Sequence, residues 1–156
     1  MKTVVRFSLA VVLLACLAVA QDKPSFSGKW VMNSSKSEFG AFPGPDSRTD
    51  DIDHKEPKIK VMSATKGQQG ERTTERNYTT DGEENTNAGF GGNPMKSKTR
   101  WEGKTLVTET KLKFQDNDVE IKDVWELLEE GKVLVIKRDL KSSQGEISQK
   151  VHFDKK

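Results

Sequence analysis

Residues 105–127 read TLVTETKLKFQDNDVEIKDVWEL, and this stretch decides the fold class. Its first part alternates apolar and threonine side chains with charged ones, and Asp116-Asn117 then provides a turn. Its last part alternates again, so that Val119, Ile121, Asp123, Trp125 and Leu127 share one face. Such a period of two residues is typical of β-strands. The stretch therefore predicts two long antiparallel strands joined by a short turn.

The same pattern continues on both sides of this hairpin. Alternating stretches at 95–101, 134–140 and 147–153 are separated by short Gly-containing turn sequences. Residues 124–130 also have helical propensity, but the glycine turn that follows and the neighbouring strands favour a strand there. The C-terminal half therefore predicts a meander of four or five long strands.

The N-terminal half has a weaker β pattern. The expected strands contain fewer apolar residues and lie at 26–33, 51–55, 58–65, 71–80 and 84–88. Pro57 leaves open whether the second and third are two strands or one bent strand, and Asp81-Gly82 predicts a turn. Residues 34–48 form a Gly- and Pro-rich linker, in which Ser35 and Glu38 could cap one helical turn.

Together these segments give eight to ten strands. A flat sheet of that size would leave long unpaired edges, which closure of the sheet removes. We therefore expect an all-β fold, an antiparallel up-and-down β-barrel.

Residues 1–20 have the features of a cleavable secretory signal. Two basic residues precede the apolar run 7–20, which ends in the small-x-small sequence Ala18-Val19-Ala20. The run is shorter than the roughly 20 residues that a membrane-spanning helix needs. We expect cleavage after Ala20, export to the periplasm or the outside, and one domain over residues 21–156 with no membrane span.

Cys16 is the only cysteine and lies within this signal. The exported domain would then have no disulfide, which favours a bacterial periplasmic protein over a small secreted eukaryotic one. An alternative is a lipoprotein anchored through Cys16, because Leu13-Leu14-Ala15-Cys16 loosely resembles a lipobox.

The charge balance argues against nucleic acid as a partner. The full chain has 26 Lys and Arg against 24 Asp and Glu, and residues 1–20 hold two of the basic residues and none of the acidic ones. Residues 21–156 are therefore formally neutral, with the two signs interspersed. Nucleic-acid binders usually keep a basic face, so no nucleic-acid binding is expected.

Gly28-Lys29-Trp30 in the first strand, with the chain of hairpins after it, resembles the calycin group of barrels, the lipocalins and fatty-acid-binding proteins. The likeness is greatest to small, uncharacterised exported bacterial proteins described as lipocalin-like, which share residues 28–33, residues 36–40 and the Pro-Gly-Pro linker. The resemblance implies that Gly28 and Trp30 are structural, with Trp30 closing the barrel bottom. It suggests a binding role without implying a specific activity. The chain lacks the usual lipocalin C-terminal helix and the space for two lid helices.

Any ligand site of such a barrel would use inward-facing residues. Trp101, Trp125 and Arg138 fall on inward faces, and Arg76 shares a face with Tyr78. A guanidinium beside a phenol hydroxyl can hold a carboxylate, so these five residues are the candidate site for an anionic amphipathic ligand.

The alternative interpretations of the same residues are structural. The tryptophans would simply fill the core, and Arg138 would stack across Trp30. Arg76 would point outward and pair with Glu75 or Glu84.

No pattern for catalysis, metal or a cofactor is present. His54 lies beside Asp51 and Asp53, but in an extended strand the two carboxylates face away from the imidazole, so we expect a solvated edge and no metal. His152 is also expected to face solvent. The sequence has no Ser-His-Asp, HExxH, CxxC or P-loop arrangement, and only Arg76, Tyr78, Asp123 and Arg138 could serve an enzyme. We therefore predict a non-enzymatic barrel that binds a small apolar or amphipathic ligand. The alternative is a filled, non-catalytic structural or interaction module of the cell envelope.

Overall fold

The computed structural model describes residues 23–89, 92–114 and 116–156. The expected signal peptide, its cleavage site after Ala20 and the lipid anchor at Cys16 lie outside these residues. Within the described part of the chain, no helix has the length and apolar character needed to cross a membrane.

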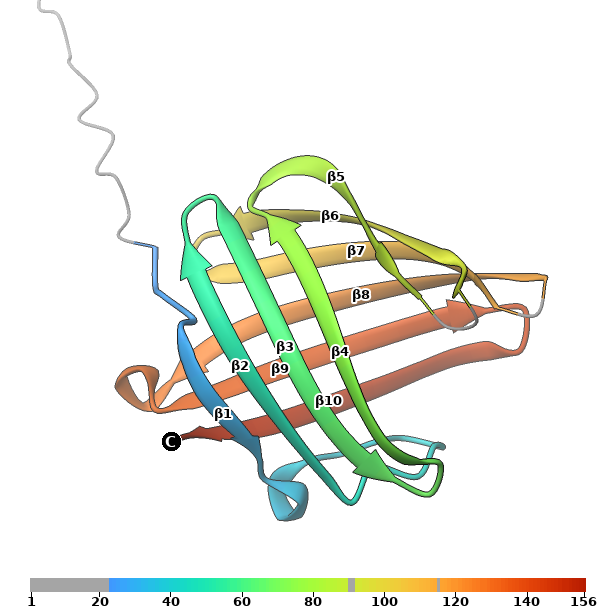
Figure 1. Cartoon of the computed structure of the whole chain (residues 1–156), viewed down its shortest axis with the longest axis horizontal. Coiled ribbons are helices and arrows are strands. Elements are labelled where there is room, and N and C mark those ends of the chain that lie inside the picture. The colour runs from blue at the N-terminus through green and yellow to red at the C-terminus, as the bar shows by residue number, and fades with distance from the viewer. Residues whose placement is uncertain (1–22, 90–91, 115) are drawn as a thin grey trace, which may run out of the picture.

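The described residues form ten antiparallel strands that wrap around one interior (Figure 1). The strands are β1 Gly28–Met32, β2 Ser47–Lys55, β3 Lys58–Gly67, β4 Gly70–Thr79, β5 Asp81–Ala88, β6 Pro94–Glu102, β7 Thr105–Phe114, β8 Asn117–Leu128, β9 Val133–Ser142 and β10 Gly145–Lys155. Two short 3-10 turns, η1 Ser34–Lys36 and η3 Glu129–Gly131, follow β1 and β8.

The strands pair in the order β4-β3-β2-β1-β10-β9-β8-β7-β6-β5. The first and last strands meet: β1 pairs with β10, with Met32 opposite Phe153. Strands β4 and β5 close the circle without a shared backbone ladder, and we call this junction the seam. The predicted up-and-down barrel is therefore confirmed, nearly closed and with ten strands.

Alternation of side chains places the core inside the barrel. In β3, Ile59, Val61 and Ser63 are buried, and Lys60 and Met62 between them are exposed. Residues 124–128 belong to β8 and are not helical, because Asp123 and Trp125 continue the inward face of that strand. The strand prediction for 124–130 is therefore confirmed for residues 124–128 against local helix propensity, whereas Glu129 and Glu130 lie in the 3-10 turn η3.

The sequence left open whether one bent strand or two strands flank Pro57, and the structure has two. Two boundaries differ from the sequence-based prediction. β2 begins at Ser47, so Arg48 belongs to a strand and not to the linker. The expected turn at Asp81-Gly82 is wrong by one or two residues: the chain turns at Thr80, and a bulge between Asp81 and Glu84 absorbs the irregularity within β5.

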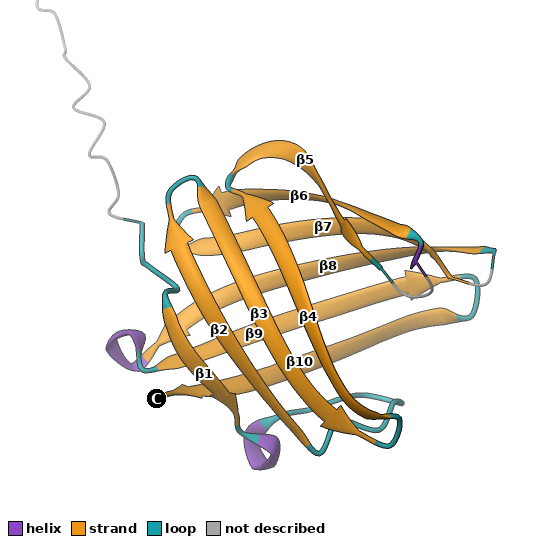
Figure 2. Ribbon diagram, in the orientation of Figure 1, coloured by secondary structure: helices purple, strands orange, loops and turns teal. Residues whose placement is uncertain are grey.

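Residues 33–46 cross the end of the barrel between β1 and β2, and we call them the strap (Figure 2). The expected cap by Ser35 and Glu38 does not form. Ser35 Oγ donates to Asn33 Oδ1, whereas Glu38 pairs through its backbone with Lys150 of β10. The single turn η1 in this segment confirms that no pair of lid helices is present here.

Candidate functional site

One end of the barrel is closed by Phe26, which is fully buried. Its backbone is held at both polar atoms: the N–H donates to His54 Nδ1 at 3.2 Å, and the carbonyl accepts from Trp30 Nε1 at 2.8 Å. Its ring stacks on Trp101 at 5.9 Å and meets the edge of Trp125 at 5.8 Å. The segment before β1 therefore acts as a plug.

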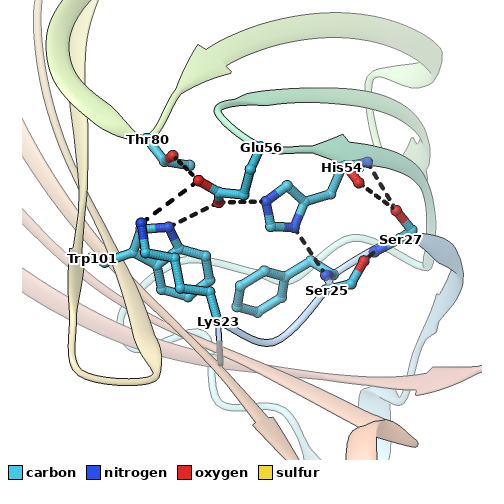
Figure 3. A network of polar contacts seen from close by, with 8 residues as sticks. Lys23, Ser25, Ser27, His54, Glu56, Thr80 and Trp101 are labelled. Atoms are coloured by element: carbon cyan, nitrogen blue, oxygen red, sulfur yellow. Dashed lines mark hydrogen bonds and ion pairs between the residues drawn. The ribbon is translucent and has the colours of Figure 1, made fainter. Parts of the chain in front are cut away.

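Glu56 links this plug to the strands around it (Figure 3). Its carboxylate accepts from Thr80 Oγ1 at 2.7 Å, from Trp101 Nε1 at 2.9 Å and from His54 Nε2 at 2.8 Å, and Lys23 lies 3.7 Å away. Burial opposes ionisation, but these hydrogen bonds outweigh it and lower the pKa of Glu56. We call Phe26, His54, Glu56 and Trp101 the closing cluster.

The solvated edge expected for His54 is wrong. Its side chain is only 3% exposed and it stacks on Phe26 and Trp101. Because Nδ1 accepts the Phe26 N–H, the imidazole proton lies on Nε2 and is donated to Glu56. The expected outward direction of Asp51 and Asp53 is confirmed, and in the described residues no group of three or more His, Cys, Asp or Glu side chains could hold a metal ion. His152 is half-buried, and burial lowers its pKa.

Next to the closing cluster lies an apolar floor that includes Trp30. Gly28 has φ +139°, a backbone conformation that favours glycine, and a Cβ there would displace the flexible end of the Lys155 side chain. The Lys155 ammonium lies 5.1 Å from the Trp30 ring centre, as in a cation–π contact. Arg138 does not stack on Trp30, so that interpretation is wrong.

Further toward the strap, the interior becomes polar, and we call this layer the polar belt. Hydroxyl pairs join β6 to β7 across it, Ser97 with Thr110 and Thr99 with Thr108, each at 2.9 Å. The belt consists of Arg48, Asp50, Ser63, Arg76, Tyr78, Ser97, Thr99, Thr108, Thr110, Asp123 and Arg138.

Two arginines of the belt are paired with aspartates. Arg138 of β9 donates from Nε and Nη2 to Asp123 at 2.7 and 2.8 Å. Arg48 donates in the same way to the fully buried Asp50 at 2.9 and 2.7 Å. Such two-point pairs fix both side chains in direction, and the Asp123 carboxylate raises the pKa of Arg138. The predicted inward direction of Arg138 is confirmed.

Arg76 has no such carboxylate partner in the part of the chain that the structure describes. It lies inside beside Tyr78, so the interpretation as an outward charge paired with Glu75 or Glu84 is wrong. Its buried Nε has no hydrogen-bond partner among the described residues, and the same holds for the buried Nε1 of Trp125. Burial is the main cause that lowers the pKa of Arg76 and raises that of Tyr78.

The five candidate residues separate into two places. Arg76, Tyr78, Trp125 and Arg138 lie together, with Tyr78 6.3 Å from Trp125 and close enough to both arginines to influence their charge. Trp101 instead belongs to the closing cluster. Sequence reasoning missed Arg48 and Asp50, although Arg48, Asp50, Ile52 and His54 alternate in the same phase as the inward residues.

A cavity of about 150 Å³ lies between the polar belt and the strap. Phe39, Pro43 and Pro45 of the strap cover it, and Arg48, Arg138 and Gln149 supply its polar lining. On the outer surface, a wider groove of about 580 Å³ runs over the seam and is lined by β2, β3, β4 and β5.

At the seam, side chains replace the missing backbone ladder. Asn87 Oδ1 accepts from the Asn77 N–H at 2.7 Å and its Nδ2 donates to the Asn77 carbonyl at 2.9 Å. Asn85 Oδ1 accepts from the Thr79 N–H at 2.6 Å. Two asparagines therefore tie β4 to β5.

No protein-family model and no curated protein sequence matches this chain. Several solved structures are similar in fold. A fatty acid transporter, REP1-NXSQ, has a TM-score of 0.60 at 14% identity, over 84% of this chain and 96% of its own. Secretory abundant heat soluble protein 4 from Ramazzottius varieornatus has a TM-score of 0.60 at 17% identity, over 84% and 94%.

Zebrafish ileal bile acid-binding protein, in complex with cholic acid, has a TM-score of 0.59 at 16% identity, over 84% of this chain and 98% of its own. Similarity at such identities concerns the fold alone. The chain therefore shares with these structures a nearly closed, antiparallel up-and-down barrel fold.

Proposed function

We propose that this protein is an exported, non-enzymatic barrel that binds a small apolar or amphipathic ligand in its interior, with an anionic group of the ligand next to Arg76. One observation carries the proposal: Arg48 and Arg138 each have an aspartate, whereas Arg76 has no carboxylate within ion-pair distance among the described residues. The polar belt therefore lacks one negative charge.

The Nε–H of Arg76 is buried without a partner, and a buried donor of a charged group that is left unpaired is costly. Perturbed, unpartnered ionisable groups are concentrated at functional sites for this reason. An anionic ligand would supply the missing charge, and Tyr78 would donate a second hydrogen bond to it. The buried Trp125 ring, which lies beside Tyr78, would pack against the apolar part of the ligand.

Two further observations support the proposal. The similar structures named above include a fatty acid transporter and a bile acid-binding protein, so barrels of this shape hold amphipathic molecules. Residues 1–20 have the composition of a secretory signal, which supports export.

The test compares decanoate with decanol, which differ in head-group charge, in titrations followed by tryptophan fluorescence. We expect saturable binding and a preference for decanoate. In Arg76→Met, decanoate affinity should fall about tenfold or more, because a hydrogen bond to a charged group is worth about 1.5–3 kcal/mol. The free energy of unfolding should not fall, since the variant removes an uncompensated buried charge.

The matched control is Lys98→Met, an exposed lysine on β6 without an ion pair among the described residues. It should bind both probes as the original protein does. Absence of saturable binding of either probe would favour the alternative, a filled structural or interaction module. Equal loss of decanoate and decanol binding in Arg76→Met would remove the charge argument.

A further inference from the structure

The strap is held firmly against β10. Glu38 and Lys150 exchange two backbone hydrogen bonds of 2.8 Å, and Gln149 Nε2 donates to the Phe39 carbonyl at 3.1 Å. Gly40 has φ +64°, and a side chain there would meet the Ser148 carbonyl; at Gly44 it would collide with the Phe39 ring. The strap therefore packs closely over the cavity beneath it.

The cavity has an apolar roof and a cationic floor. Its roof is Phe39, Pro43 and Pro45, and its polar lining is Arg48, Arg138 and Gln149. A guanidinium has five N–H donors, and each of these arginines uses only Nε and Nη2 for its aspartate. Within the described residues, the Nη1 groups of Arg48 and Arg138 have no hydrogen-bond partner.

The aspartates hold both guanidiniums in place while these donors remain free. Arg48 comes from β2 and Arg138 from β9, so the two lie on different sides of the β1–β10 junction and line the same cavity. The pairs themselves are neutral, and the unbalanced charge of Arg76 lies nearby. The surroundings of the cavity therefore favour a single negative charge.

The volume restricts what can fit. Pockets for drug-sized ligands usually measure about 300–1,000 Å³, whereas a cavity of about 150 Å³ holds a molecule the size of benzene. We propose that the cavity under the strap binds a compact monoanion, an aromatic or short-chain carboxylate about the size of benzoate. Its carboxylate would accept from Arg48 and Arg138, and its apolar part would lie against Phe39, Pro43 and Pro45. The inference goes beyond the proposed function: its site lies under the strap at Arg48 and Arg138, and it shares with the proposed function only the unbalanced positive charge of Arg76.

Benzoate and its neutral counterpart benzyl alcohol are the probes, and backbone amide chemical shifts are the main measurement. We expect benzoate to shift amides of the strap, of Arg48 and of Gln149 saturably, and benzyl alcohol to bind at least tenfold more weakly. Replacing one buried ion pair by apolar residues is often neutral for stability. The double variant Arg48→Met/Asp50→Leu should therefore remain folded and lose at least tenfold in benzoate affinity.

Val151→Phe, which fills the cavity from β10, should abolish the shifts, and Lys98→Met should leave them unchanged. Benzoate shifts away from the strap, or unchanged affinity in Arg48→Met/Asp50→Leu, would overturn the inference. The two proposals fail in distinguishable ways. If decanoate binds saturably and benzoate does not shift the strap, only the compact-anion site fails. If neither probe binds, the proposed function fails as well.

Discussion

At the scale of single residues, Tyr78 offers a direct measure of the interior environment. It is the only tyrosine of the chain, so tyrosinate absorbance reports on it alone. Burial disfavours the phenolate and raises the pKa of Tyr78 above its ordinary value of 10.0. We expect it to ionise above pH 10 in the folded protein and near pH 10 in concentrated urea.

The sign of the linked effect on stability follows from that direction. A group whose pKa is raised by folding stabilises the protein fully below its unfolded pKa, and the contribution is lost as the pH rises through the folded pKa. The free energy of unfolding should therefore fall more steeply above pH 10 in the original protein than in Tyr78→Phe. Equal slopes, or ionisation at pH 10 without urea, would contradict the burial of this hydroxyl.

Single residues also show how far the site could be predicted. Arg76, Tyr78, Trp125 and Arg138 were assigned to the interior because alternation reports which side of a strand a residue faces. Alternation says nothing about partners: the aspartate of Arg138 comes from the neighbouring strand and that of Arg48 from its own. Arg76 lacks a carboxylate partner among the described residues, and the proposed function depends on this. It can be recognised only from the three-dimensional structure.

His54 illustrates a different error. Its phase relative to Asp51 and Asp53 already indicated the inward face, yet its polarity suggested solvent. The buried site is possible because the Phe26 N–H and the Glu56 carboxylate satisfy both ring nitrogens. Neither partner could be recognised from spacing along the chain.

At the scale of elements, the seam is where two neighbouring strands, β4 and β5, are joined by side chains without a shared backbone ladder. Asn87→Ala would leave the Asn77 N–H and carbonyl without their partners, at a cost of about 1–3 kcal/mol in the free energy of unfolding. Amide hydrogen exchange should accelerate at Asn77 and Thr79 while it stays slow in β7 to β9. Thr86→Ala, on the exposed side of β5, is the control and should change stability by less than about 0.5 kcal/mol.

The strands of the C-terminal half were predicted well because their alternation is long and their turns contain glycine. Those around the seam were predicted less well, since the bulge at Asp81 to Glu84 shifts the phase of β5. Such a bulge inserts residues without a sequence signature that differs from an ordinary turn. The role of Asn85 and Asn87 also had no signal, because asparagine is usually found in turns.

At the scale of the whole molecule, the two ends of the barrel differ. The closing cluster seals one end through a buried aromatic plug, whereas among the described residues the strap lies across the other end. A ligand that reaches the polar belt through this end must displace the strap. The alternative path crosses the seam, where two asparagine side chains connect the strands.

A disulfide across the strap would separate these paths. Glu38 and Lys150 form a hydrogen-bonded antiparallel pair, for which Cα atoms lie about 5.5 Å apart, within the range of about 4.4–6.8 Å that a disulfide spans. The chain without residues 1–20 has no cysteine, so Glu38→Cys/Lys150→Cys would form a single defined bond. In its oxidised form we expect slower association and slower release of decanoate by stopped-flow fluorescence, with the original rates restored by reduction. Glu38→Ser/Lys150→Ser should behave as the original protein. Identical rates in the oxidised and reduced forms would instead identify the seam as the route, and Asn87→Ala would then accelerate both steps.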